Sequence, residues 1–544
     1  MKKFVLCCTA VLAGASLLLA ACSSNSGSQQ GGAAAPAQSQ GTQTAASGNA
    51  GASAEDVLYH VYSSIPYTTL DPSIEYSNGI MVLQNVYETL THYNSEISEL
   101  EPMLATEWSS NEDGTVWTFQ LRDDVTFHDG TPMTSAQVKA SLDRTISLGQ
   151  GAAYNWDSVE SIEATGDYEI TITCSAAAPI DLISSAGYAG YIMSDAAIAQ
   201  DAEWFNAGND GGTGPYCITQ ATKDTVVLQA YEDYYGGWSD DQYKNVLIKE
   251  VSESSARRQM LETGEAQFSD SFSNMDLEAL SKADGLYTYQ ADTWTNCIVF
   301  LNSQKYPCDN AEFRKALQYA FPYRETIDVV LAGNAVQSYG MVPNGMWAHD
   351  NSLFQYSTDL DEARAHLEAS GVDTNGLTLS VTYSTSYPEY SSSLQLWQAN
   401  LRELGIDLEL RAMEWDAQWA ESQATDPNDR QDILIMRWWP DYASPSSWFD
   451  SLVHSEESIT FNLAYINNAD LDQILEEATA NVATDRSKAE ELYIEAQKIL
   501  IDEAYMINVF DDSHTYVINN GISGVMENPA YPTVVSYYNI KKTN

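Results

Sequence analysis

The chain between residues 357 and 450 alternates between helical and strand periodicity. Apolar residues recur every three or four positions in some stretches and every second position in others, and one stretch is continuously apolar. The predicted elements are a helix at 359–369, a strand at 377–383, a helix over 394–404, a strand at 406–413, a short helix and a buried strand at 433–436. Strands and helices in this order are typical of a mostly parallel sheet with right-handed crossovers.

The same two periods mark the rest of the chain from residue 56 onward. Alternating apolar positions predict strands at 117–121 and 170–173, and Thr134 with Gln137 predicts a capping box that opens a helix. Amphipathic helices are expected near 468–481 and 485–503, and a strand is expected over Val534, Val535, Tyr537 and Ile540. No long linker interrupts this pattern, which indicates interleaved lobes.

The most promising position for a site follows the strand at 433–436. Ligands bind beyond the carboxyl ends of parallel strands, and that position holds Arg437-Trp-Trp-Pro-Asp-Tyr442. Asp441 lies among aromatic residues, which would exclude water from the carboxylate and favour pairing with an ammonium group. The alternative is that Asp441 caps the next helix, although Ser444 and Pro445 already supply a cap. Both roles stay open.

The neighbours of Asp441 also have two interpretations. Trp438 and Trp439 are adjacent on a strand, so at least one of them is expected to point into the core. Arg437 could meet a ligand carboxylate or a neighbouring acidic residue. With 76 Asp and Glu residues in the chain, the ion pair is favoured.

The N-terminus reads as a processing signal. Lys2 and Lys3 precede an uncharged, mostly apolar run, and Leu19-Ala-Ala-Cys22 resembles the bacterial lipobox. We therefore expect residues 1–21 to be a lipoprotein signal peptide and Cys22 to carry the lipid; a retained transmembrane helix is the alternative. Residues 22–54 are rich in Ser, Gly, Ala and Gln, which predicts a disordered tether.

Length and charge narrow the class of protein. A chain of 544 residues exceeds the size of one hydrophobic core, so two or three lobes are expected. The net charge of −51 repels phosphate backbones and excludes nucleic acid as a partner. It could also concentrate cationic ligands, but a solubilising surface is the favoured explanation of the charge.

The sequence gives no positive sign of catalysis, a cofactor or a metal. It contains no zinc-protease, nucleophile-elbow, P-loop or dinucleotide motif, and its seven histidines are scattered. Four cysteines lie beyond the N-terminal segment, at 174, 217, 297 and 308. Outside the cytoplasm they permit two disulfides, and four free thiols are equally consistent with the sequence. We expect a binding protein and no enzyme.

Three groups of residues resemble the family 5 extracellular solute-binding proteins, the oligopeptide- and dipeptide-binding receptors of ABC importers. The first group contains Leu104-Ala-Thr-Glu-Trp108, Asn111 to Arg122 and Val125 to Thr134. The second is Gly212-Thr-Gly-Pro-Tyr216, and the third is Phe313-Arg-Lys-Ala-Leu-Gln-Tyr-Ala320 after Asn302 and Asn310. The resemblance covers roughly residues 56–544.

The resemblance implies an α/β, two-lobed periplasmic-binding-protein-like fold of the large three-domain type (class II), with a ligand cleft between the lobes. Lobe I would be formed by residues 55–91, 206–293 and 505–544. A small inserted domain would occupy 92–205, and lobe II would occupy 294–504.

It also implies a site and a set of partners. Trp438, Asp441 and Tyr442 match the family motif whose carboxylate binds the α-ammonium of a peptide. The expected ligand-binding residues are Asp441, Trp438, Tyr442, Arg437, Trp294, Thr295, Tyr76 and Ser77. Where some relatives carry an arginine for the peptide carboxylate, this chain has Ile435.

The expected protein is thus a monomer, lipid-anchored on the extracytoplasmic face of the cell membrane. It would capture short peptides and deliver them to an ABC permease and its ATPase. A receptor of the same fold for an oligosaccharide or another solute is the first alternative, and a secreted hydrolase is the second.

Overall fold

The structure is a computed structural model that describes residues 56–456, 458–531 and 533–543. The chain divides into two units, Met1–Gly51 and Ala52–Asn544, and the second unit contains all the described residues. The predicted signal peptide, Cys22 and the tether lie outside these residues and stay predictions.

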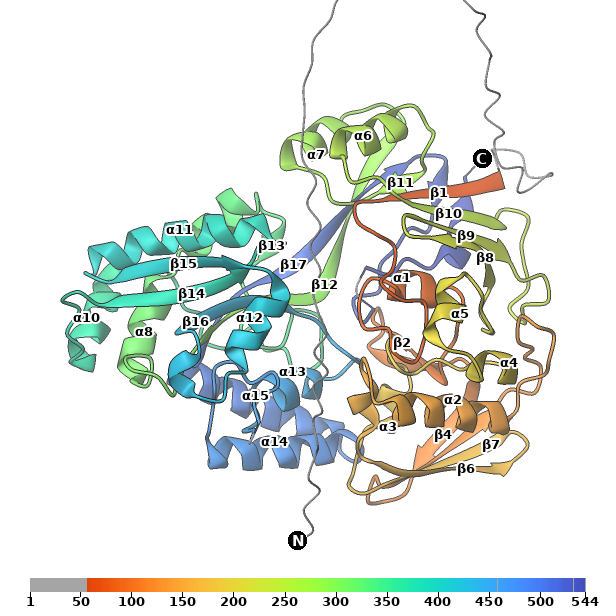
Figure 1. Cartoon of the computed structure of the whole chain (residues 1–544), viewed down its shortest axis with the longest axis horizontal. Helices are drawn as coiled ribbons and strands as arrows, with labels where there is room; N and C mark the ends of the chain where they lie inside the picture. The colour runs from red at the N-terminus through yellow and green to blue at the C-terminus, as the bar shows by residue number, and fades with distance from the viewer. Residues whose placement is uncertain (1–55, 457, 532, 544) are drawn as a thin grey trace, which may run out of the picture. The chain divides into compact units, whose positions relative to one another are not determined.

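A mixed eleven-stranded sheet organises the described residues (Figure 1). Its order is β15-β14-β16-β12-β17-β11-β1-β10-β9-β8, and β13 pairs with β17 off this path. The strands are β1 Val57–Tyr62, β8 Tyr216–Thr222, β9 Thr225–Ala230, β10 Asn245–Glu250, β11 Phe268–Ser269, β12 Leu286–Leu301, β13 Ala335–Val336, β14 Thr378–Ser384, β15 Asp407–Met413, β16 Ile433–Trp438 and β17 Met506–Asn519.

Three smaller sheets complete the β structure. The largest has four antiparallel strands in the order β4-β5-β7-β6 and lies within the predicted inserted domain. The strands are β4 Ala105–Ser110, β5 Val116–Leu121, β6 Val159–Gly166 and β7 Glu169–Cys174, with the two-stranded pairs β2 Thr91–Asn94/β3 Glu99–Pro102 and β18 Ile522–Ser523/β19 Lys541–Lys542.

Fifteen α-helices occur among the described residues, and most are short. They are α1 Ile80–Leu83, α2 Ser135–Leu148, α3 Ile180–Ile183, α4 Asp195–Ile198, α5 Ala202–Asn206, α6 Ser254–Glu262, α7 Asn274–Leu280, α8 Ala311–Ala320, α9 Tyr323–Glu325, α10 Leu360–Ser370, α11 Pro388–Glu403, α12 Trp415–Ser422, α13 Ser446–Leu452, α14 Ala469–Val482 and α15 Arg486–Glu503.

The βαβ alternation predicted from periodicity is confirmed. Strand β14 pairs in parallel with both β15 and β16, and α11 and α12 provide the connections. Residues 433–436 of β16 are buried, as a continuous apolar run requires. The parallel part ends there, because β12 runs antiparallel to β16.

Strands β12 and β17 connect two hydrophobic cores. They pair antiparallel along most of their length, with register shifts between Asp292 and Asn296 and between Cys297 and Ile298. On one side of the first shift, Ala291 and Tyr516 belong to a core with β1, β9 and β10. On the other side, the strands contribute to a core with β14, β15 and β16. Two long strands are therefore shared by these two cores.

Local signals explain several boundaries. The Thr134 hydroxyl accepts a hydrogen bond from the backbone of Ala136, and Gln137 accepts one from the backbone of Thr134, so the predicted capping interactions open α2. Gly149 ends this helix in the left-handed region at φ 58°.

The strand predicted near the C-terminus is wrong. Residues Tyr537–Asn539 form a 3₁₀ turn, Val535 makes an isolated bridge with Glu527, and the nearest strand is the two-residue β19. Val534 and Val535 are both buried although they are adjacent, which one face of a strand does not allow. Their apolar character reflects burial from several sides.

Two further expectations can be compared with the described residues. Within them, no helix is long and apolar enough to cross a membrane. The cysteines at 174, 217, 297 and 308 are all free thiols, and three of them are buried.

Candidate functional site

The segment between β16 and α13 carries the predicted site. The N-cap position of α13 is Pro445, and no side chain of the described residues, that of Asp441 included, makes a cap hydrogen bond there. The Asp441 side chain is therefore not engaged as that cap. The capping alternative raised from the sequence is disfavoured.

Asp441 is buried, with 9% of its surface exposed. Its backbone N–H donates to the Ser447 hydroxyl at 2.9 Å, and this hydroxyl lies 3.3 Å from the carboxylate, to which it donates. Among the described residues, no lysine, arginine or histidine pairs with this carboxylate. An acidic group kept dry without a basic partner is costly, so such groups are concentrated at functional sites.

Burial controls the ionisation of this carboxyl group. Loss of water raises the pKa of Asp441 to about 6, and hydrogen bonds from the Tyr154 and Ser447 hydroxyls oppose the rise. The group is therefore mostly ionised at neutral pH. It offers a concentrated negative charge to a cationic ligand.

Tyr154 was not predicted from the sequence. It lies in the 3₁₀ helix η2 (Ala153–Trp156) of the segment 92–205, and its hydroxyl reaches Asp441. Burial and the nearby Asp441 charge raise the pKa of Tyr154, although 41% of the residue is exposed. No local pattern could have found it, because the contact joins distant parts of the chain.

A second contact of this kind involves Trp439. Burial raises the pKa of Tyr188 far above its usual value, the charges of Glu75 and Asp441 raise it further, and a hydrogen bond with Trp439 lowers it. The Tyr188 hydroxyl also donates to the backbone oxygen of Ser77 at 3.4 Å. The loop at 75–77 and the segment at 439–441 therefore both lie close to Tyr188.

The other residues predicted from the loop at 75–77 and from β12 differ in accessibility. Tyr76 is 64% exposed, whereas Trp294 is only 1% exposed and its ring packs edge-on to Tyr93 at 5.6 Å. Thr295 is buried beside it, and its backbone N–H donates to the Thr293 hydroxyl at 3.2 Å. Tyr76 is accessible to a ligand, and Trp294 is part of the core.

Trp438 and Tyr442 are anchored on either side of Asp441. The Trp438 indole donates to the backbone oxygen of Ser447 at 3.2 Å, and its ring lies 5.0 Å from that of Phe461. The Tyr442 hydroxyl is 2.9 Å from that of Ser446. Both side chains fix the conformation of the turn that holds Asp441.

Arg437 is already neutralised. Its guanidinium lies 2.7 Å from Glu389 and 2.7 Å from Asp512. The ring of Tyr387 also lies 4.7 Å from it. These contacts match the second interpretation taken from the sequence, in which Arg437 pairs with neighbouring acidic residues.

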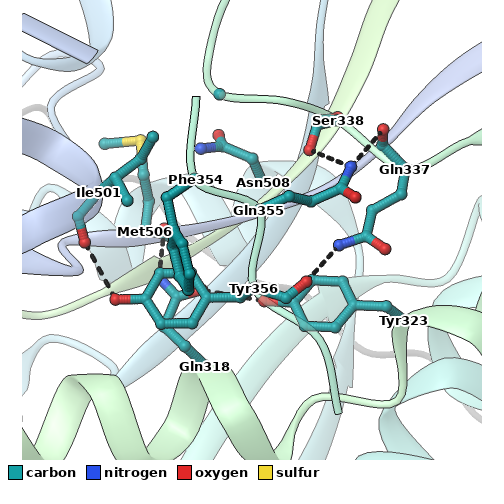
Figure 2. Close-up of a pocket in the computed structure, with 11 residues that line it drawn as sticks. Gln318, Tyr323, Gln337, Ser338, Phe354, Gln355, Tyr356, Ile501, Met506 and Asn508 are labelled. Atoms are coloured by element: carbon teal, nitrogen blue, oxygen red, sulfur yellow. Dashed lines mark hydrogen bonds between the residues drawn. The ribbon is translucent and has the colours of Figure 1, made fainter. Parts of the chain in front are cut away.

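A small cavity lies elsewhere in the described residues (Figure 2). Its volume of about 20 Å³ holds roughly one water molecule. Its lining residues include Gln318, Gln355 and Asn508, and none of the predicted site residues is among them. No group of three or more potential metal ligands occurs within the described part of the chain.

Asp441 lies beyond the carboxyl end of a parallel strand, the position at which open α/β sheets bind their ligands. The model of the family described as bacterial extracellular solute-binding proteins, family 5 Middle, matches residues 99–459, and the chain belongs to this family. Its members are binding receptors and not enzymes.

Individual proteins support the same assignment. The chain is 28% identical over 487 residues to the "Probable D,D-dipeptide-binding periplasmic protein DdpA" of Escherichia coli, covering 87% of this chain and 92% of that protein. The fold is similar to that of DppA from Helicobacter pylori in complex with the peptide STSA, with a TM-score of 0.75, 22% identity, and coverage of 90% and 98%. It is also similar to NikA from Brucella suis in complex with Fe(III)-EDTA, with a TM-score of 0.78, 20% identity, and coverage of 90% and 100%.

Proposed function

We propose that this chain is the peptide receptor of an ABC importer and that Asp441 binds the N-terminal ammonium of a short peptide. The observation that carries the proposal is the buried carboxylate of Asp441, which has no basic partner among the described residues. An ammonium group supplies both the missing charge and up to three hydrogen-bond donors. The dipeptide named for the relative DdpA and the peptide bound to DppA agree with such a ligand.

The capture mechanism follows from contacts that meet at Asp441. Tyr154 and Tyr188 come from the segment 92–205, whereas Trp439 and Asp441 come from the predicted lobe II. A ligand held between these groups favours the closed arrangement, because it binds both sides only when they are together. We further propose that peptide backbone groups pair with the protein as an added strand, with hydrated pockets for the side chains.

The predicted anchor and domain limits belong to the same proposal. Cys22 would carry the lipid, and residues 22–54 would let the receptor reach a permease while the membrane retains it. Lobe I would comprise 55–91, 206–293 and 505–544, with 92–205 inserted and lobe II at 294–504. Closure of the lobes would then present the docking surface to the permease, which with its ATPase imports the peptide.

A sugar or another solute remains the second candidate, because the NikA structure shows that the same fold holds a metal chelate. A sugar receptor would use Trp438, Trp439 and Trp294 as stacking surfaces and would retain affinity after Asp441→Asn. The 1% exposure of Trp294 removes one of these surfaces. The contacts therefore favour the ammonium ligand.

Native mass spectrometry of protein purified without denaturation tests the proposal. Co-purified masses that differ by amino-acid residues, and that are lost in Asp441→Asn, are the expected result. A hexose ladder retained by Asp441→Asn would instead identify a sugar receptor. Cleavage of added peptide or glycan by an empty protein would identify a hydrolase.

A further inference from the structure

The buried arginine side chains among the described residues are already engaged. Arg437 binds Glu389 and Asp512, as described above, and Arg144 makes two hydrogen bonds of 2.7 Å to Asp71. The two others use backbone oxygens instead. Arg257 donates to Val251, Ser252 and Ser271, and Arg314 donates to Cys308 and Glu503.

Arg486 is more exposed but is also committed. Its side chain is 40% exposed, and its guanidinium lies 3.3 Å from Asp181, whose side chain is 11% exposed. Burial raises the pKa of Asp181, and the charge of Arg486 opposes that rise. Moving Arg486 onto a ligand would leave the buried Asp181 without its basic partner, which is unfavourable.

The surroundings of the proposed site hold buried acidic groups that no basic side chain of the described residues balances. Asp441 and Glu75 both act on Tyr188, and neither forms an ion pair among the described residues. Glu75 is 1% exposed and accepts a hydrogen bond from the backbone of Gly79 at 3.0 Å. Burial raises the pKa of both carboxyl groups.

A peptide with a free carboxylate places a second charged group in or near this site. A desolvated carboxylate needs a positive partner, and nearby carboxylates repel it. One bound ammonium compensates only the charge of Asp441. A ligand with a masked or distant carboxylate avoids both penalties and brings a net positive charge into the site itself.

From these charges we propose that the site recognises the ammonium end of its ligand alone and selects ligands that bring a net positive charge into the enclosed part of the site. Peptides with an amidated carboxyl terminus, or with a carboxylate that lies beyond the enclosed residues, bind at least as tightly as short free acids. This inference rests on the proposed function, because it concerns the other end of the same ligand.

The test compares four matched libraries in which the first residue of an Xaa-Ala dipeptide is varied. The libraries carry a free amine or a hydrogen in its place, each combined with a free carboxylate or a carboxamide. Affinities of the full chain are measured at pH 7.5 and low salt by competition and calorimetry. The proposal predicts that amides of the best first residues bind as tightly as the acids or up to about tenfold more tightly.

The two readouts separate the two proposals. Loss of about 100-fold or more in affinity without the amine supports recognition at Asp441. If the amine is required but the free acid binds measurably more tightly than the amide, only the carboxyl-terminus inference is overturned. If desamino ligands bind equally well, or if no library binds, the proposed function fails and this inference fails with it.

Discussion

Replacing Asp441 by asparagine removes the charge that burial disfavours while keeping the shape of the side chain. The pKa of Asp441 is raised to about 6 in the folded protein, against an ordinary value of 3.8. The folded protein therefore binds this proton more tightly than the unfolded chain does. As pH rises from about 4 to above 6, the unfolded chain ionises first, and the free energy of unfolding falls.

The magnitude follows from the difference between these two values. Each pKa unit corresponds to about 1.36 kcal/mol, so ionisation of Asp441 costs the folded state about 3 kcal/mol at pH 8. The N–H groups of the new asparagine amide need hydrogen-bond acceptors, and any that stay unpaired reduce the gain in stability. We expect the free energy of unfolding of ligand-free Asp441→Asn to exceed that of the wild type by about 1–3 kcal/mol at pH 8. Below pH 4 the two values should be nearly equal.

The assay is urea unfolding of the ligand-free wild type and variant between pH 4 and pH 8, after removal of co-purified ligand. Asp123→Asn is the matched control, because it removes the same charge from an exposed position. The control should leave the pH dependence unchanged. An Asp441→Asn variant that is less stable than the wild type at pH 8 would refute the reasoning, since Asp441 would then be stabilised in place by the protein.

Three further predictions concern binding. Affinity for a free-amine peptide should fall as pH decreases through about 6, because Asp441 becomes protonated and loses its charge; calorimetry from pH 5 to pH 8 measures this, and a flat profile would contradict it. Tyr154→Phe should move that fall to higher pH, because the Tyr154 hydroxyl lowers the pKa of Asp441, and an unchanged midpoint would exclude the contact. Arg486→Gln should weaken binding about three- to tenfold and expand the ligand-free protein in small-angle scattering, because the ion pair with Asp181 joins the predicted lobe II to the segment 92–205. Unchanged values in both measurements would show that the pair does not favour closure.

The sequence predicted the regular part of the fold well because local periodicity determines it. The strand at 433–436 was recognisable from four consecutive apolar residues, and α2 from its capping box. The end of the chain was misassigned because burial at Val534 and Val535 depends on several distant segments. Periodicity cannot distinguish that kind of burial from a strand.

The candidate site was only half predictable. Asp441 was found because it follows a predicted strand and matches a family motif. Tyr154, Tyr188 and the partners of Arg437 come from elsewhere in the chain, so only the tertiary structure brings them together. Charge composition favoured an acidic neighbour for Arg437 but could not name Glu389 or Asp512.

A crystal structure of the protein with its co-purified ligand tests the central claim most directly. The ligand is predicted to place an ammonium nitrogen within about 3 Å of the Asp441 carboxylate, with Tyr154 beside it. A structure in which Asp441 faces bulk water or pairs with an arginine, while the ligand lies elsewhere, would contradict the account.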